Sequence, residues 1–395
     1  MEASLAELGL LAESAGASVV GTLLQERPRK DAATLIGRGK VGEVAARAEA
    51  TGADLVVFDH ELSPAQQRNL EERLSRKTLD RTQLILDIFA RRATTREGRL
   101  QVELAQLEYL LPRLTGKGIS LSRLGGGIGT RGPGETKLET DRRRIRQRIQ
   151  TMKQEIERVR RHRGTRREAR RRSEYPVVAL VGYTNAGKST LFSALTRAAA
   201  AVSDQLFVTL DPLVRRASLG PGLDVLLVDT VGFIQKLPHG LVAAFRATLE
   251  EVVEADLLLH VMDASAIDLS ERGTAVERVL EEIGAVEKPP RLVVLNKCDR
   301  LGREQAVRLR EGRPGDVLVS ALTGQGLEDL RSVLRRQLSL APKPVRLRFR
   351  TADRQGIAGV YTAGRVVAHE VLGEETRIDV ELPERLLERY REHLI

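Results

Sequence analysis

Apolar residues in the first part of the chain alternate between runs of strand length and stretches of helical spacing. Residues 18–24 and 54–58 are short apolar runs that predict strands, and residues 41–50 between them predict a helix. The glycine pair within residues 37–40 lacks the spacing of a phosphate-binding loop and predicts a turn. Strands separated by a helix indicate a small α/β domain with a parallel sheet, which we assign to residues 1–98.

The next part of the chain has two segments in which apolar residues recur at alternating spacings of four and three, the seam of two packed helices. The seam residues are Leu100, Leu104, Leu107, Leu111 and Leu114, then Ile145, Ile149, Met152, Ile156 and Val159. Between the segments, residues 115–134 contain eight glycines, which exclude one continuous helix. The pattern predicts an antiparallel helical hairpin over residues 99–173, with a glycine-rich tip and a second helix over about residues 135–172.

Alternation of strands and helices returns in residues 174–341. The predicted strands are residues 177–181, 224–229, 257–262, 291–295 and 316–319. Helical stretches separate most of them, which is typical of a doubly wound parallel sheet. We therefore predict an α/β domain over residues 174–341.

The last part of the chain, residues 342–395, predicts a small α+β domain. Pro342 and Pro344 indicate a linker at its start. Residues 366–371 and 376–382 are expected to pair as strands around a turn, and a helix is expected from Pro383.

The net charge of +10 is concentrated in the second helix of the predicted hairpin. Residues 141–172 hold 15 Lys and Arg against four Asp and Glu, and the rest of the chain is close to neutral. A solvated helix normally mixes the two signs, so this bias favours a polyanion partner, RNA or DNA. The candidate RNA-binding residues at the start of the segment are Arg142, Arg143, Arg144, Arg146 and Arg148.

Composition narrows the classes of function further. Aromatic residues make up 3% of the chain and Trp is absent, which disfavours an aromatic stacking platform for single-stranded nucleic acid. The single cysteine, Cys298, excludes a disulfide framework and a cysteine-based zinc site. The longest apolar runs are far shorter than the roughly 18 residues that cross a bilayer. We expect a soluble, cytoplasmic protein that acts as a monomer and has no membrane partner.

Residues 182–189, with the sequence GYTNAGKS, fit the phosphate-binding loop of nucleotide-binding proteins. They follow a predicted strand and begin a helix, so backbone N–H groups can converge on phosphate oxygens. Lys188 is placed to neutralise the β- and γ-phosphates, and the Ser189 hydroxyl to bind Mg²⁺. The predicted phosphate-binding residues are Gly182, Asn185, Ala186, Gly187, Lys188, Ser189 and Thr190.

The base of the nucleotide is indicated by residues 296–299, with the sequence NKCD, at the end of a predicted strand. The Asp299 carboxylate can accept from two guanine donors that adenine lacks, and an adenine nucleotide would leave it unpaired. Lys297 is expected along the base, and a backbone N–H in the Ser320–Ala321 turn is expected to reach guanine O6. The predicted guanine-binding residues are Asn296, Lys297, Asp299, Ser320 and Ala321.

Two further segments are expected to sense the γ-phosphate. Asp229 ends a predicted strand and would hold Mg²⁺ through water, while the Gly232 N–H would meet the γ-phosphate. Thr209 lies between the phosphate loop and Asp229 and is expected to close over Mg²⁺. These segments are the predicted switches, ordered by GTP and released after hydrolysis. The sequence thus predicts a GTPase with GTP or GDP as ligand and Mg²⁺ as cofactor.

The chain resembles the HflX GTPases in these motifs and in residues 125–141, GGGIGTRGPGETKLETD, a stretch that ordinary GTPases lack. The resemblance runs from about Leu35 to the C-terminus. It implies binding to the large ribosomal subunit and its rRNA, with ribosome splitting or rescue, and a hairpin that reaches toward the peptidyl transferase centre. Members of this family usually begin with a strand, whereas residues 5–11 predict a helix, which leaves the order of the first sheet open.

Two residues in the motifs suggest how hydrolysis is activated. Phe233 stands where many GTPases have the Gln that orients the attacking water. Hydrolysis must then use another group, the backbone or a surface of the ribosome to orient that water. The other interpretation of Phe233 is that its side chain simply packs within the switch. Asn185 occupies the position at which potassium-activated GTPases carry Asn, and by resemblance its amide oxygen would help to hold K⁺. The alternative is a turn-forming Asn.

Other functions stay open at this point. The protein could act on another RNA, in tRNA modification or subunit maturation. It could also be a GTP-gated binding factor in which hydrolysis only times release. The resemblance further allows ATP binding by the N-terminal domain, although residues 1–98 contain no phosphate loop.

Overall fold

The computed structural model describes residues 2–27, 29–114, 137–171, 175–197, 206–220, 223–235, 246–285, 289–340 and 342–395. The predicted glycine-rich tip lies outside the described residues. The chain divides into two compact units. One unit is Met1–Thr165 with Ser203–Asp211 and Ile234–Thr248, and the other is Arg166–Val202, Pro212–Phe233 and Leu249–Ile395.

The first unit begins with a small α/β arrangement. Its elements are α1 (Glu2–Ser14), α2 (Arg38–Thr51), β1 (Leu55–Phe58), α3 (Pro64–Leu74), β2 (Lys77–Asp80) and α4 (Arg81–Arg92). The predicted parallel sheet is present, because β1 and β2 pair in parallel. The opening helix is confirmed as α1, and the helix over residues 41–50 is confirmed as α2.

Two local predictions in this unit are wrong. Residues 18–24 form no strand, and Val19 and Val20 are 40% and 51% exposed, so this apolar run is not buried against a neighbouring strand. Residues 37–40 are not a turn, because Gly37 is the N-cap of α2 and the helix begins at Arg38. In this region, an apolar run therefore led to the prediction of a strand that does not form.

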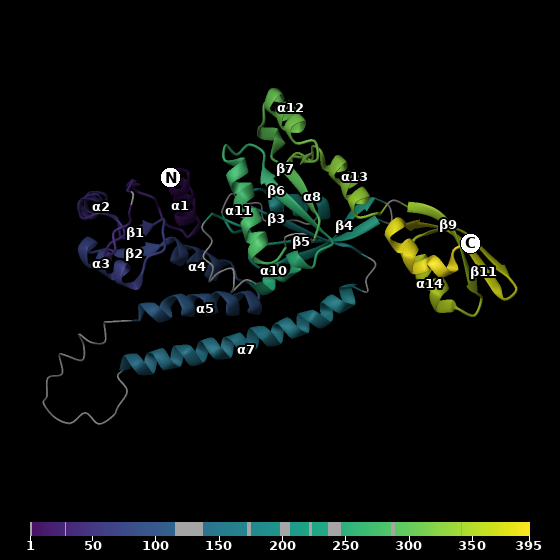
Figure 1. Ribbon diagram of the computed structural model, residues 1–395, viewed down its shortest axis with the longest axis horizontal. Helices are drawn as coiled ribbons and strands as arrows, with labels where there is room; N and C mark the ends of the chain where they lie inside the picture. Colours follow the sequence, from purple (N-terminus) through teal and green to yellow (C-terminus); the bar gives the residue numbers. More distant parts are fainter. Residues whose placement is uncertain are drawn as a thin grey trace. The chain divides into compact units, whose positions relative to one another are not determined.

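The predicted helical hairpin forms from α5 (Arg96–Leu110), the 3₁₀ turn η1 (Leu111–Arg113) and α7 (Lys137–Arg171), and Figure 1 shows α5 and α7 side by side. Leu100, Leu104 and Met152 are buried together at the seam, with Leu107, Ile149 and Ile156 packed against them. Ion pairs cross between the helices: Arg148 Nη2 lies 2.9 Å from Glu103 Oε1, Lys153 Nζ lies 2.8 Å from Glu108 Oε1, and Arg96 Nη2 lies 3.4 Å from Glu155 Oε2. The alternating spacing of four and three thus marks a real helix–helix contact.

The second unit contains a six-stranded sheet in the order β4-β5-β3-β6-β7-β8 (Figure 1). The strands are β3 (Val177–Gly182), β4 (Leu213–Gly220), β5 (Leu223–Asp229), β6 (Leu257–Asp263), β7 (Arg291–Asn296) and β8 (Val317–Leu318). The other elements are α8 (Lys188–Thr196), α10 (Arg246–Val253), α11 (Leu269–Glu282), η2 (Cys298–Arg300), α12 (Arg303–Gly312) and α13 (Leu327–Gln337). All five predicted strands are present and parallel, and the prediction missed β4, which runs antiparallel to β5.

A three-stranded antiparallel sheet, in the order β10-β11-β9, ends the chain. Its elements are β9 (Pro342–Arg350), α14 (Arg354–Ala363), β10 (Arg365–Leu372), β11 (Glu375–Pro383) and η3 (Glu384–His393). Pro342 and Pro344 were predicted to mark a linker, but they lie in β9, an edge strand where proline is tolerated. The predicted C-terminal helix is a 3₁₀ helix, η3.

Candidate functional site

The predicted phosphate loop lies between the end of β3 and the start of α8, as the sequence predicts. Two of its residues adopt left-handed backbone conformations, Asn185 with φ 58° and Gly187 with φ 87°. A β-carbon at Gly187 would also collide with the Asn296 side chain, so only glycine fits there. This geometry turns the chain sharply from the strand into the first turn of α8, whose N–H groups face the loop.

Lys188 is buried at the first position of α8. Its Nζ donates to the carbonyl oxygens of Gly182, at 3.0 Å, and Tyr183, at 2.9 Å. Burial lowers the pKa of Lys188 to about 8, and the nearby Asp229 carboxylate opposes this shift. The ammonium group is thus positioned by two carbonyl groups of the loop. A phosphate bound beside it would raise the pKa of Lys188 again, because an opposite charge favours the protonated form.

Raising the pH from 7 to 9 is expected to weaken GDP binding. The phosphates attract the protonated ammonium, and in the free protein the Lys188 ammonium is lost above its pKa of about 8. Bound phosphates raise that pKa, so affinity should fall by up to about tenfold per pH unit above this value. Titration of a fluorescent GDP at several pH values measures the effect. Lys188→Arg keeps its charge throughout and should show a flat profile, whereas a flat profile in the unaltered protein would contradict the prediction.

Ser189 and Asp229 meet at the ends of α8 and β5. Ser189 Oγ donates to Asp229 Oδ2 at 2.8 Å, and Asp229 is fully buried. Hydroxyl and carboxylate oxygens are the ligands that Mg²⁺ prefers, and adjacent ligands of an octahedral site lie about 3 Å apart. The pair therefore fits a magnesium site of the predicted kind. Among the described residues, no group of three or more His, Cys, Asp or Glu side chains offers another metal site.

The predicted Mg²⁺ ligand Thr209 lies in the segment Leu206–Asp211, which belongs to the first unit. Ser189 and Asp229 belong to the second unit, and the role of Thr209 as a third ligand stays a prediction. This segment packs against the N-terminal elements.

The start of predicted switch II is hydrogen-bonded to the phosphate loop. Phe233 N donates to Gly182 O at 3.1 Å, and Thr184 N donates to Phe233 O at 2.7 Å. The Phe233 side chain is 1% exposed, and a β-carbon at Gly232 would collide with Thr184. Phe233 thus extends the pairing of β3 with β5 by one isolated bridge, which agrees with its predicted packing role.

Asn296 joins the phosphate loop to the predicted base-binding turn. Its Nδ2 donates to Ala186 O at 2.9 Å, and its Oδ1 accepts from Ala321 N at 2.9 Å. Because the amide is buried and both ends are satisfied, Asn296 acts as a connector between two loops. The sequence analysis placed Asn296 among the predicted guanine-binding residues, and in the structure its amide is taken up by Ala186 and Ala321.

Asp299 and Ser320 are also brought together. Ser320 Oγ donates to Asp299 Oδ1 at 2.5 Å, which fixes the orientation of the carboxylate. Lys297 has a left-handed backbone with φ 65°, and its Nζ lies 2.7 Å from the carboxylate of Asp263. The predicted guanine site is therefore a preformed group of side chains at the carboxyl ends of β7 and β8.

Asp263 and Thr230 are two supporting residues that the sequence analysis missed. Asp263 ends β6 and pairs with Lys297; burial opposes its ionisation, but hydrogen bonds from Lys297 and Ser265 hold its pKa below the usual range. Thr230 Oγ1 donates to Leu180 O at 2.5 Å and fixes the end of β5 beside β3. Polar residues directly after buried strands were the available signal, since parallel strands end at one edge of the sheet.

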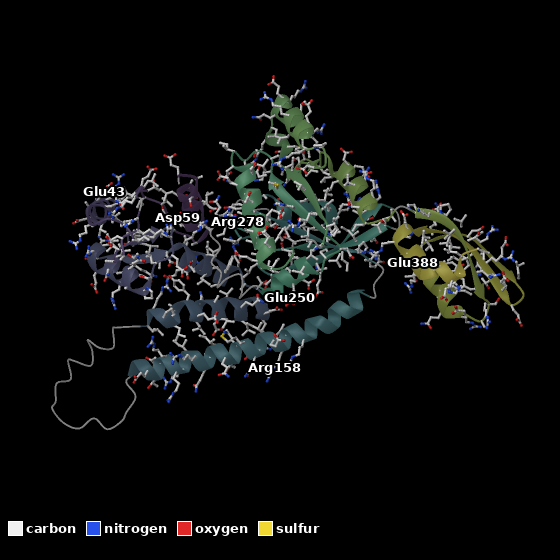
Figure 2. The ribbon with its side chains drawn as sticks, viewed as in Figure 1. Glu43, Asp59, Arg158, Glu250, Arg278 and Glu388 are labelled. Atoms are coloured by element: carbon white, nitrogen blue, oxygen red, sulfur yellow. The ribbon has the colours of Figure 1, made fainter. Side chains whose placement is uncertain are left out.

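The predicted RNA-binding arginines lie near the start of α7. Arg143, Arg144 and Arg146 are exposed, whereas Arg148 is partly engaged by Glu103 on α5. Figure 2 shows the long side chains along this helix, including the exposed Arg158. None of the described helices has the length and apolar character needed to cross a membrane.

The chain is similar to three known protein families in consecutive segments. The chain matches the family "GTP-binding GTPase N-terminal" over residues 2–90, "GTP-binding GTPase Middle Region" over residues 92–170 and "50S ribosome-binding GTPase" over residues 177–297. A crystal structure of a GTP-binding protein from Sulfolobus solfataricus with GDP is 26% identical, with a TM-score of 0.44, covering 84% of this chain and 94% of that one.

Curated relatives extend the match to nearly the whole chain. "GTPase HflX" of Caldanaerobacter subterraneus is 47% identical over 100% of this chain and 91% of its own length. "GTPase HflX" of Escherichia coli is 48% identical over 89% of this chain and 85% of its own. On these identities and coverages, the chain belongs to the HflX family and is a GTPase with a GTP- and GDP-binding G domain.

Proposed function

We propose that this GTPase binds the large ribosomal subunit through its helical hairpin and uses GTP binding and hydrolysis to split or rescue ribosomes in the cytoplasm. The observation that carries the proposal is the row of exposed arginines on α7, on a hairpin that belongs to the same chain as the G domain. Guanidinium groups bind phosphate oxygens in a bidentate manner, and rRNA offers them densely. The match of the G domain to a family described as 50S ribosome-binding GTPases supports this choice of partner.

The roles of the site residues are part of this proposal. Lys188 and the backbone of the phosphate loop bind the β- and γ-phosphates, and Ser189 with Asp229 holds Mg²⁺, which neutralises phosphate charge when bound. Asp299 reads the guanine base, with Ser320 fixing its orientation. Thr209 in switch I and Gly232 in switch II respond to the γ-phosphate. The division of the chain at residues 98, 173 and 341 remains a prediction of the same kind.

Co-sedimentation with purified large subunits tests the partner. The protein should pellet with large subunits in the presence of a non-hydrolysable GTP analogue and remain in the supernatant with GDP. Small subunits and bulk tRNA serve as controls, since both are also polyanions. Preferential binding to either control would favour action on another RNA.

A second measurement separates gating from hydrolysis-driven work. Whole ribosomes are incubated with the protein and either GTP or the analogue, and the subunits are separated on sucrose gradients. Splitting with the analogue alone would mean that the GTP-bound form does the work and that hydrolysis times release. Absence of splitting with both nucleotides would remove splitting from the proposal.

Turnover by the free protein is expected to be slow and to rise in K⁺ relative to Na⁺. The reason is that Phe233 is buried and offers no hydrogen bond to water, so charge neutralisation by a cation held at Asn185 would matter more. We expect a rise of about tenfold, which corresponds to about 1.4 kcal/mol of transition-state stabilisation.

Asn185→Gly is the matched variant for this cation effect. Glycine accepts the left-handed backbone at position 185 without strain, so only the amide is removed. The K⁺ effect should disappear while GDP binding persists. Equal turnover in the two salts for the unaltered protein would contradict the role of Asn185.

A further inference from the structure

The segment Leu206–Asp211, which contains predicted switch I, packs against the N-terminal elements of its unit. Phe207 is buried with φ 56°, and its ring meets that of Phe89 on α4 edge to face at 4.7 Å. Leu206 N donates to Ser14 Oγ, at the end of α1, at 3.1 Å. Leu210 is also buried. Phe207 and Leu210 are thus buried on either side of Thr209. The ring contact anchors the segment to α4, and the hydrogen bond to Ser14 anchors it to α1.

Asp211 makes the most specific contact of the segment, at the N-terminus of α5. Its Oδ2 accepts from Thr94 N at 2.9 Å, Thr94 Oγ1 at 2.8 Å and Thr95 N at 2.8 Å. Its Oδ1 accepts from Thr95 Oγ1 at 2.5 Å. Both carboxylate oxygens are thus engaged by two neighbouring residues at the base of the hairpin.

Thr95 connects this carboxylate to the helix itself. Thr95 is the N-cap of α5, and its Oγ1 accepts from Gly98 N at 3.0 Å while the same hydroxyl donates to Asp211. The carboxylate also lies at the positive end of the helix dipole.

Gly98 makes room for the contact. It is buried in the first turn of α5, and a β-carbon built there would collide with Asp211 Oδ1. Alanine is favoured over glycine in helices, so the glycine is not explained by helix stability. Gly98, which has no side chain, instead allows the carboxylate of Asp211 to approach α5 closely.

We propose that Asp211 is a positioning residue that links switch I to the helical hairpin, so that a ligand of the hairpin alters GTP turnover through this carboxylate. The inference rests on the proposed function for the identity of that ligand, the large subunit. Asp211 follows Thr209 by two residues, and α5 is the first helix of the hairpin. A nucleotide that moves switch I also moves Asp211 and thereby alters its hydrogen bonds to Thr95, the N-cap of α5. By linkage, a ligand that binds the hairpin and alters the start of α5 changes the position of switch I.

Gly98→Ala tests the link from the hairpin side, because it changes no residue of the G domain and acts on Asp211 only through the added β-carbon. Its matched control is Gly42→Ala in α2, where an added β-carbon meets nothing within 4 Å. Hydrogen exchange at the backbone amides of residues 95–99 is measured with GDP and with a non-hydrolysable GTP analogue. In the unaltered protein and in Gly42→Ala the rates should differ at least threefold between nucleotides. In Gly98→Ala this difference should vanish.

Turnover provides the second readout. Large subunits should raise kcat of the unaltered protein, and Gly98→Ala should reduce that rise at least fivefold while basal kcat, KM and GDP affinity stay within twofold. Asp211→Asn, which keeps the shape of the side chain and removes its charge, should also reduce the stimulation by large subunits and abolish the exchange difference at residues 95–99. It also serves as the test if Gly98→Ala does not fold.

The two proposals fail differently. No nucleotide-dependent difference at residues 95–99 in the unaltered protein, or the same difference in both variants, would overturn the link through Asp211. A lack of stimulation by large subunits, with the exchange difference still present and lost in Gly98→Ala, would overturn the ribosomal partner and leave the link standing.

Discussion

Asp299→Asn is expected to lower GTP affinity by more than tenfold. The substitution replaces one acceptor of the predicted guanine contact by an NH₂ donor that faces the guanine donors. An unsatisfied buried group costs about 1–3 kcal/mol, which corresponds to about five- to 150-fold in affinity. The hydrogen bond from Ser320 Oγ at 2.5 Å holds the carboxylate in one orientation, so the altered side chain cannot easily turn away.

The same variant should gain affinity for xanthosine nucleotides, because xanthine carries an oxygen where guanine carries its exocyclic amine. Titration with GDP and XDP measures both changes. Asp329→Asn, at an exposed position in the first turn of α13, controls for loss of one charge in the same domain. Unchanged GDP binding in Asp299→Asn would show that base recognition lies elsewhere.

Replacing Arg143, Arg144 and Arg146 together by Gln is expected to weaken binding to large subunits by at least about tenfold. Each phosphate contact releases counterions, so the slope of log affinity against log salt should flatten by about two to three units. These three side chains are exposed. Arg148 is left unchanged because its ion pair with Glu103 helps to hold the hairpin together.

The control variant removes the same charge from another helix. Arg303, Arg308 and Arg310 are exposed on α12, and their replacement by Gln should leave both affinity and salt slope unchanged. GDP binding should survive in both triple variants. Equal losses in the two variants would mean that net charge, rather than the hairpin, determines binding.

The site was more predictable from sequence than the sheets around it. Phosphate-loop and base-binding residues lie in short motifs whose backbone geometry is local, so Lys188, Ser189 and Asp299 could be named directly. Edge strands carry no such signal: β4 contains Arg215 and Arg216, and only two of its residues, Ala217 and Leu219, are buried. The opposite error occurred at residues 18–24, where apolar residues remain partly exposed outside any sheet.

The contact between Asp211 and the start of α5 could not be predicted from the sequence. Asp211 meets Thr94 and Thr95 across 117 and 116 positions of sequence. In the sequence, Asp211 is one acidic residue in a loop and Gly98 one glycine in a helical stretch. Only the fold shows that Gly98, which has no side chain, leaves room for the carboxylate of Asp211.

The two hydrogen bonds of Asn296 have a consequence for nucleotide exchange. A single amide fixes the loop that surrounds the phosphates to the turn that faces the base, so the two cannot relax independently. Part of the ordering that a ligand would impose on these two loops is therefore already present in the folded protein. A factor that moved either loop apart from the other would have to break one of these two buried hydrogen bonds.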